Sequence, residues 1–152
     1  YANIEMTQFD LPPVAPLAKA RFAQAGMADR ATIATGSFRN DPLPSGADAI
    51  SLVRVLYDHA DETVEALLKS VFAALPEGGT LIVSEPMSGG ARPQRAGDAY
   101  FALYTMAMGT GKARSADQIA VLCRNAGFTQ IKMPPVRRPF VTSCILATKC
   151  SI

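Results

Sequence analysis

Two apolar runs in the middle of the chain, at residues 49–56 and 81–83, show little alternation between apolar and polar positions. Runs of this kind, rich in Val, Ile and Leu, are typical of parallel strands that are covered on both faces. The segment between them carries apolar residues at helical spacing, so it predicts an amphipathic helix with one apolar stripe. The stripe consists of Val64, Leu67, Leu68, Val71 and Leu75.

Local signals mark both ends of this helix. Asp58 and Asp61 offer N-caps, and Glu62 favours the first turn through the helix dipole. Pro76 must end the helix, because proline lacks an amide donor and restricts the residue before it. A Gly-Gly turn at 78–79 then leads into the second apolar run. This order predicts a strand–helix–strand unit, whose right-handed crossover makes the two strands parallel.

The first third of the chain predicts another unit of the same kind. Residues 3–9 and 30–38 are expected to form strands. Residues 14–25 are expected to form the helix between them, closed by Gly26.

The last third predicts a different ending. Ser115 and Gln118 form a capping box that begins a helix, and strands are expected at 128–133 and 140–149. The connection between these strands is too short for a crossover, so they should be antiparallel. The predicted class is therefore α/β, Rossmann-like, with a mostly parallel sheet and an antiparallel C-terminal edge.

Polar groups follow the two central runs. Tyr57, Asp58 and His59 come after the first run, and Ser84 and Glu85 come at the end of the second. Ligands of open parallel sheets bind beyond the carboxyl ends of the strands. These five side chains are therefore expected at one functional edge.

Two further residues lie at predicted strand ends, and each has two interpretations. Asp10 is well placed to accept hydrogen bonds from both hydroxyls of a ribose, or it simply caps the helix that follows. Phe38 either stacks against a planar ring or belongs to the core.

Residues 97–108 are apolar on nearly every side, and a Gly-Thr-Gly sequence at 109–111 follows them. A helix without a polar face is either deeply buried, as a packed interface helix, or faces an apolar ligand or partner. Its Met and aromatic side chains also suit a pocket for a flexible apolar substrate.

The composition excludes several classes of protein. The 152 residues are 49% hydrophobic with a formal net charge of +2, which indicates one globular domain and gives no basis for nucleic-acid binding. Three cysteines without CxxC spacing favour reduced thiols in a cytoplasmic protein. One histidine and no ligand cluster argue against a metal site, and no apolar run reaches the roughly 20 residues of a membrane span.

Five motifs in order resemble one known family: FDLP at 9–12, GSF at 36–38, RVLYDHADE at 54–62, ALPEGGTLIVSE at 74–85 and AGF at 126–128. Together they resemble the catalytic domain of S-adenosylmethionine-dependent O-methyltransferases, over nearly all of the chain. The SLVRVLYDHADETV and SEPMSGGARP segments look closest to the hydroxyneurosporene and demethylspheroidene branch of bacterial carotenoid synthesis. The resemblance implies a class I methyltransferase fold and S-adenosyl-L-methionine as the cofactor.

The resemblance also implies roles for the residues that bind the cofactor. Asp10 would hold the ribose, and Ser37 and Phe38 would lie along the adenine. Arg54 would contact the methionine end of the cofactor or organise that wall, although it could instead be a salt-bridge residue at a strand edge.

The catalytic residues that the resemblance implies depart from the family pattern. Relatives that methylate phenols have His where this chain has Tyr57. Tyr57 would orient the substrate oxygen, His59 would take the proton, and Glu85 matches an acid that orients the base. Alternatively, His59 is an exposed residue at the start of a helix. An aliphatic alcohol is much less acidic than a phenol, so positioning should contribute more to catalysis here.

The family's glycine-rich strand–turn–helix and dimerising N-terminal domain would precede Tyr1. We therefore expect residues 1–152 to be the C-terminal part of a catalytic domain, inactive alone and homodimeric in the complete protein, with possible peripheral contact with membranes. Two alternatives remain: a nicotinamide-dependent oxidoreductase, and a catalytically silent, dimerising relative that acts as a binding module.

Overall fold

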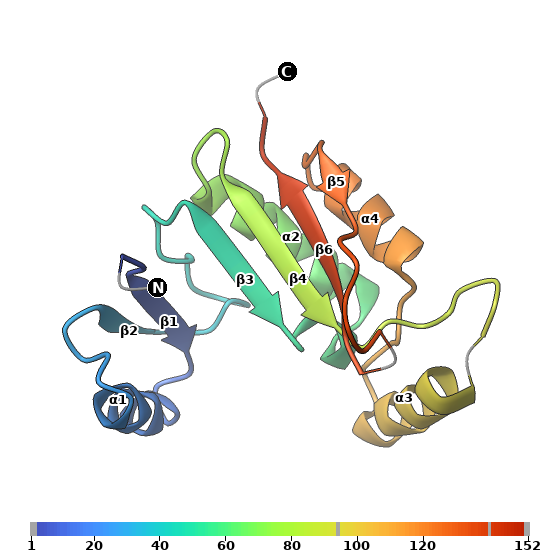
Figure 1. The fold of residues 1–152 in the computed structure, drawn as a ribbon, viewed down its shortest axis with the longest axis horizontal. Coiled ribbons are helices and arrows are strands. Elements are labelled where there is room, and N and C mark those ends of the chain that lie inside the picture. The colour runs from blue at the N-terminus through green and yellow to red at the C-terminus, as the bar shows by residue number, and fades with distance from the viewer. Residues whose placement is uncertain (1–2, 94, 140, 151–152) are drawn as a thin grey trace. The chain divides into compact units, whose positions relative to one another are not determined.

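The computed structural model describes residues 3–93, 95–139 and 141–150. It divides into two compact units, Tyr1–Ser45 and Gly46–Ile152, and each is described by itself. Both units combine parallel strands with helices, as the predicted α/β class requires (Figure 1).

Unit 1 is a strand–helix–strand unit. Strand β1 (Met6–Asp10) pairs in parallel with β2 (Ala31–Thr35), and helix α1 (Ala15–Gln24) connects them. Gly26 follows α1 with φ 66°, a left-handed conformation that glycine adopts without steric cost. The predicted elements are present, and both strands are shorter than the apolar pattern indicated.

Unit 2 contains a four-stranded sheet in the order β3-β4-β6-β5 (Figure 1). β3 pairs with β4 in parallel, whereas β6 is antiparallel to both β4 and β5, which confirms the antiparallel ending. The elements in chain order are β3 (Ala49–Val53), the 3₁₀ helix η1 (Leu56–Asp58), α2 (Asp61–Ala74), β4 (Thr80–Glu85), α3 (Arg95–Met108), α4 (Ala116–Asn125), β5 (Ile131–Lys132) and β6 (Ser143–Thr148).

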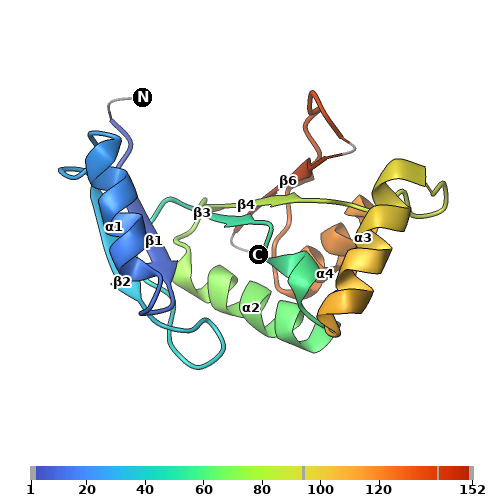
Figure 2. The same ribbon diagram turned by 90° about the horizontal axis from the view of Figure 1, so that it is seen from below.

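The core of unit 2 lies between the sheet and helices α2 and α4, which cover one face of it (Figure 2). All five residues of the predicted α2 stripe are buried. α2 ends before Pro76, and the Ser115–Gln118 capping box begins α4, both as predicted. Leu81, Val83, Ile145 and Ala147 face the helices as alternate residues of β4 and β6.

The predicted strand at 49–56 is too long. β3 ends at Val53, because Arg54 takes a left-handed conformation with φ 55° and the chain then turns into η1. The apolar side chain of Leu56 is buried in this turn, so its apolar character does not mark a continuation of the strand. Val53 is 58% exposed, so β3 is not covered on both faces.

Both N-cap predictions for α2 are wrong. Ala60 occupies the N-cap position without a side-chain hydrogen bond, Asp61 is already helical, and Asp58 belongs to η1. Glu62 lies in the first turn, as predicted.

The remaining differences concern the last third of the chain. α3 is not deeply buried, since Tyr100, Leu103 and Met106 are each more than 60% exposed. The strand predicted at 128–133 is reduced to β5, and the one predicted at 140–149 is observed as β6; its expected first residue, Phe140, lies outside the described residues.

Phe128 anchors the core of unit 2. It is 1% exposed, and its ring meets Phe72 edge to face with centroids 5.1 Å apart. We expect Phe128→Ala to lower the free energy of unfolding by about 3–5 kcal/mol, because it removes buried contacts and leaves a cavity. Denaturant unfolding of the complete protein measures this. Val121→Ala, at a position 51% exposed, is the control and should cost less than about 0.5 kcal/mol.

Candidate active site

Asp10 is the last residue of β1 and lies at the carboxyl end of that strand, as expected. Its Oδ1 accepts the amide of Leu11 at 2.8 Å, and its Oδ2 accepts Gln8 Nε2 at 3.3 Å. The N-cap of α1 is Val14, without a side-chain cap, so Asp10 does not cap the helix. A carboxylate has about four acceptor sites, so Asp10 retains acceptor capacity for hydroxyl groups.

Ser37 and Phe38 lie just beyond the carboxyl end of β2, next to β1. The amide of Gly36 donates to the carbonyl of Asp10 at 3.0 Å, which brings the two strand ends together. Asp41 accepts the amide of Ser37 through Oδ2 at 2.8 Å and thereby holds this turn. Asp41 was not predicted, because its role depends on the fold of the turn and no motif marks it.

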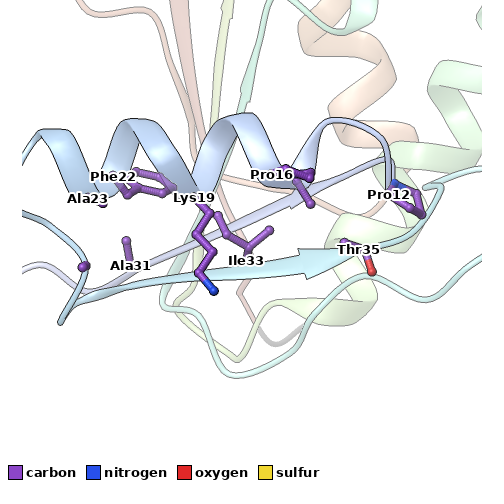
Figure 3. A pocket seen from close by; sticks show the side chains of 10 residues that line it. Pro12, Pro16, Lys19, Phe22, Ala23, Ala31, Ile33 and Thr35 are labelled. Carbon is purple, nitrogen blue, oxygen red and sulfur yellow. The ribbon is translucent and has the colours of Figure 1, made fainter.

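Unit 1 also carries an apolar groove between α1 and β2 (Figure 3). Pro16, Phe22 and Ile33 line it, together with the side chain of Lys19. Asp10, Ser37 and Phe38 are not among the lining residues, so the groove is separate from the candidate cofactor residues.

In unit 2, Arg54 and Tyr57 form a pair at the carboxyl end of β3. Arg54 Nη2 donates to the Tyr57 hydroxyl at 3.1 Å, and this hydrogen bond raises the pKa of Arg54. The left-handed backbone of Arg54 costs roughly 1–3 kcal/mol, and such conformations cluster at functional sites. Within the described part of the chain Arg54 forms no ion pair, so the structure does not support the alternative of a salt-bridge residue.

Aromatic side chains of α3 surround this pair. The Tyr57 ring meets Phe101 edge to face at 6.1 Å and lies 5.6 Å from the Tyr104 ring. The guanidinium of Arg54 lies 5.3 Å from the Tyr57 ring centroid and 6.0 Å from that of Phe101. A hydrogen bond with Tyr57 raises the pKa of Tyr104. The sequence singled out neither Phe101 nor Tyr104 within the apolar segment, since the face they share appears only once α3 is placed against η1.

Glu85 lies beneath the same turn and is 1% exposed. Its Oε1 accepts the amides of Val55 and Leu56, each at 2.8 Å. Glu85 therefore positions the backbone that precedes Tyr57. Burial raises the pKa of the Glu85 carboxyl, the amide hydrogen bonds lower it, and the nearby charge of Asp58 raises it.

Among the described residues, two buried carboxyl oxygens have no hydrogen-bond partner: Asp58 Oδ1 and Glu85 Oε2. An unpaired buried acceptor costs about 1–3 kcal/mol. The cost falls if one of these two carboxyl groups is protonated. The raised pKa of Glu85 favours its protonated form. His59 is half-buried at the end of η1, and its carbonyl accepts Arg114 Nη2 at 2.9 Å.

The raised pKa of Glu85 gives a pH prediction. Because the folded state binds the proton more tightly, the stabilisation that protonation provides is complete below the unfolded pKa and is lost as the pH rises through the folded pKa. We expect the free energy of unfolding of the parent protein, relative to Glu85→Gln, which cannot titrate, to fall as the pH rises above the ordinary pKa of a glutamate carboxyl. Denaturant unfolding at a series of pH values measures this difference, and a relative stability of the parent that rises with pH would contradict the assignment.

The structure brings together Arg54, Tyr57, His59 and Glu85 in unit 2, and Asp10, Ser37 and Phe38 in unit 1. No group of three or more potential metal ligands occurs in the described ranges. Within those ranges no helix has the length and apolar character needed to cross a membrane.

Comparisons with known proteins agree on one family. Residues 1–129 match the family model described as O-methyltransferase domain. The demethylspheroidene O-methyltransferase of Cereibacter sphaeroides is 56% identical over 99% of this chain and 40% of its own length. That of Rhodobacter capsulatus is 52% identical over 98% of this chain and 36% of its own length. Human N-acetylserotonin methyltransferase, solved in complex with SAM, superposes with a TM-score of 0.87 at 28% identity, over 99% of this chain and 42% of that one. The chain therefore spans less than half the length of these relatives.

Proposed function

The chain belongs to the O-methyltransferase domain family, and from this premise we propose that it is part of an S-adenosylmethionine-dependent O-methyltransferase that acts on a hydroxylated carotenoid. The observation that carries the proposal is the 56% identity, over 99% of the chain, to a demethylspheroidene O-methyltransferase. The substrate of this protein would be hydroxyneurosporene, demethylspheroidene or a similar hydrophobic alcohol.

We propose that unit 1 binds the adenosyl part of the cofactor. Asp10 has free acceptor capacity at a strand end and would accept hydrogen bonds from the ribose hydroxyls. Ser37 and Phe38, held in the turn beside it, would lie along the adenine. Gly36 suits a crowded position, since a Cβ there would lie 2.7 Å from the Phe9 ring.

Unit 2 would then provide the groups around the reacting atoms. S-adenosylmethionine would supply an electrophilic methyl on a positive sulfur. The substrate hydroxyl oxygen would attack this methyl in line, the C–S bond would break as the C–O bond forms, and the products would be a methyl ether and S-adenosylhomocysteine. Arg54 would contact the methionine end, and Tyr57 would orient the substrate oxygen. His59 would take the proton as the new C–O bond forms. Glu85 would hold the turn through the amides of Val55 and Leu56.

The exposed apolar side chains of α3 support a hydrophobic substrate. Tyr100, Leu103, Met106 and Met108 are all more than half exposed. Such side chains would cover a long apolar polyene, and they would also permit peripheral contact with a membrane that holds it. The protein would be cytoplasmic and homodimeric.

Methyl transfer by the complete protein tests the proposal. Isotope-labelled S-adenosylmethionine is incubated with a hydroxylated carotenoid in detergent, and labelled methyl ether is measured. The proposal predicts label in the ether and equimolar S-adenosylhomocysteine. Cofactor binding without transfer to any hydroxylated carotenoid would instead indicate a catalytically silent relative.

A further inference from the structure

Four successive backbone carbonyls of the turn that carries Tyr57 accept hydrogen bonds from one short segment, residues 110–114. We call residues 56–59 the site turn and residues 110–114 the clamp. The bonds run from Arg114 Nη1 to Leu56 O (2.9 Å), from Lys112 N to Tyr57 O (2.9 Å), from Thr110 Oγ1 to Asp58 O (3.1 Å) and from Arg114 Nη2 to His59 O (2.9 Å). The clamp therefore fixes the whole backbone of the site turn.

Arg114 is the centre of the clamp and is 2% exposed. Besides the carbonyls of Leu56 and His59, its guanidinium donates to Lys112 O at 3.2 Å. Nε and Nη2 both contact Asp61 Oδ1, at 2.8 Å and 2.6 Å. Four of these contacts are hydrogen bonds and the fifth is an ion-pair contact. Because Arg114 is also buried, its guanidinium is engaged within the protein and is not presented to substrate or cofactor.

Asp61 completes the arrangement from the first turn of α2. Its Oδ2 accepts Lys112 Nζ at 2.7 Å, so one carboxylate ties together both cations of the clamp. The hydrogen bonds from Lys112 and then Arg114 lower the pKa of Asp61, which keeps it charged at neutral pH.

The clamp also lies unusually close to the site turn. A Cβ added at Gly111 would lie 2.5 Å from the carbonyl oxygen of Tyr57, so only glycine fits without moving one of the two backbones. On the other side of the turn, Glu85 accepts the amides of Val55 and Leu56. The turn is thus held through its carbonyls by the clamp and through its amides by Glu85.

The clamp follows α3 directly, and α3 ends at Met108. Tyr104 and Phe101 of α3 contact the Tyr57 ring, while the clamp binds the Tyr57 backbone. One continuous piece of chain therefore positions both the ring and the backbone of Tyr57.

We propose that Arg114 is a positioning residue for methyl transfer: it holds the site turn so that Tyr57 and His59 face the reacting atoms, and it touches neither substrate nor cofactor. The inference rests on the function proposed above. It predicts that weakening the clamp slows turnover without weakening cofactor binding, because only the site turn moves.

The test uses Arg114→Lys in the complete protein, with Arg124→Lys at an exposed position of α4 as the matched control. Lysine keeps the charge but loses the planar fork that spans two carbonyls and a carboxylate. We expect kcat to fall about 10- to 100-fold, the scale of a 1 Å misplacement, while KM for S-adenosylmethionine changes less than about threefold. The control should leave both parameters unchanged.

Hydrogen exchange separates this inference from the proposed activity. The amides of Asp58 and His59 donate to Val55 O and Leu56 O within the turn. Their exchange should speed up in Arg114→Lys, while the exchange of β4 and β6 stays as in the parent. Faster exchange in a protein that transfers no methyl group would support the clamp and overturn the proposed function. A folded variant with parental kcat and parental exchange would overturn the clamp.

Thr110→Val is a second variant that tests the clamp if Arg114→Lys does not fold. Thr110 is exposed, and this change removes one hydrogen bond to Asp58 O at little cost in packing. A severalfold loss of kcat with unchanged KM for the cofactor would support the clamp, and parental kcat would overturn it.

Discussion

Replacing Asp10 by alanine in the complete protein is expected to weaken binding of S-adenosylmethionine by about 100- to 10,000-fold. The proposed role gives Asp10 two hydrogen bonds from ribose hydroxyls, and hydrogen bonds to charged groups contribute about 1.5–3 kcal/mol each. Two such bonds correspond to about 3–6 kcal/mol, at about 1.4 kcal/mol per tenfold change. Isothermal titration calorimetry measures the dissociation constant.

The matched control is Asp29→Ala, at an exposed position of unit 1, which should bind the cofactor like the parent. The Asp10 substitution should barely affect stability, since its hydrogen bond to the Leu11 amide is exposed. Parental affinity in a folded Asp10→Ala protein would remove the ribose assignment.

Replacing Glu85 by alanine is expected to lower the free energy of unfolding by roughly 2–6 kcal/mol. The change leaves the amides of Val55 and Leu56 without their acceptor, and each unsatisfied buried group costs about 1–3 kcal/mol. The same loss releases the turn that carries Tyr57, so methyl transfer should fall as well. Denaturant unfolding and the transfer assay measure the two effects.

Two controls bracket this result. Glu85→Gln keeps an acceptor oxygen in place and should lose far less stability than the alanine variant. Glu65→Ala, at an exposed position of α2, should cost less than about 0.5 kcal/mol. Equal losses in the Gln and Ala variants would mean that the negative charge of Glu85, and not its acceptor role, stabilises the fold.

The elements that local periodicity encodes were predictable from the sequence. The buried stripe of α2, the stop before Pro76 and the capping box at Ser115 all depend on residues within a few positions of one another. The antiparallel pairing of β5 and β6 followed from the short connection between them. The fold class followed from these elements together.

Predictions failed where a distant residue decides the local structure. The local sequence predicts Asp61 as an N-cap, but its carboxylate accepts hydrogen bonds from Lys112 and Arg114, more than fifty positions along the chain. The local sequence predicts Leu56 as the end of a strand, but its apolar side chain is buried in a turn. No local pattern reveals the ion pairs of Asp61 or the burial of Leu56 in the turn.

The candidate site divides in the same way. Motifs marked all three of Asp10, Tyr57 and Glu85. Asp10 and Glu85 end strands β1 and β4, and Tyr57 follows the apolar run at 49–56. Arg114 and Gly111 were missed, because a single arginine or glycine in a connecting segment has no periodic signature. Their roles appear only when the clamp meets the backbone of the site turn.

A crystal structure of the complete protein with S-adenosylhomocysteine tests the central claim, that Asp10 holds the ribose of the cofactor. The account predicts the Asp10 carboxylate at about 2.5–3.0 Å from both ribose hydroxyls, the usual range for such hydrogen bonds. A ribose bound away from Asp10 would contradict the account.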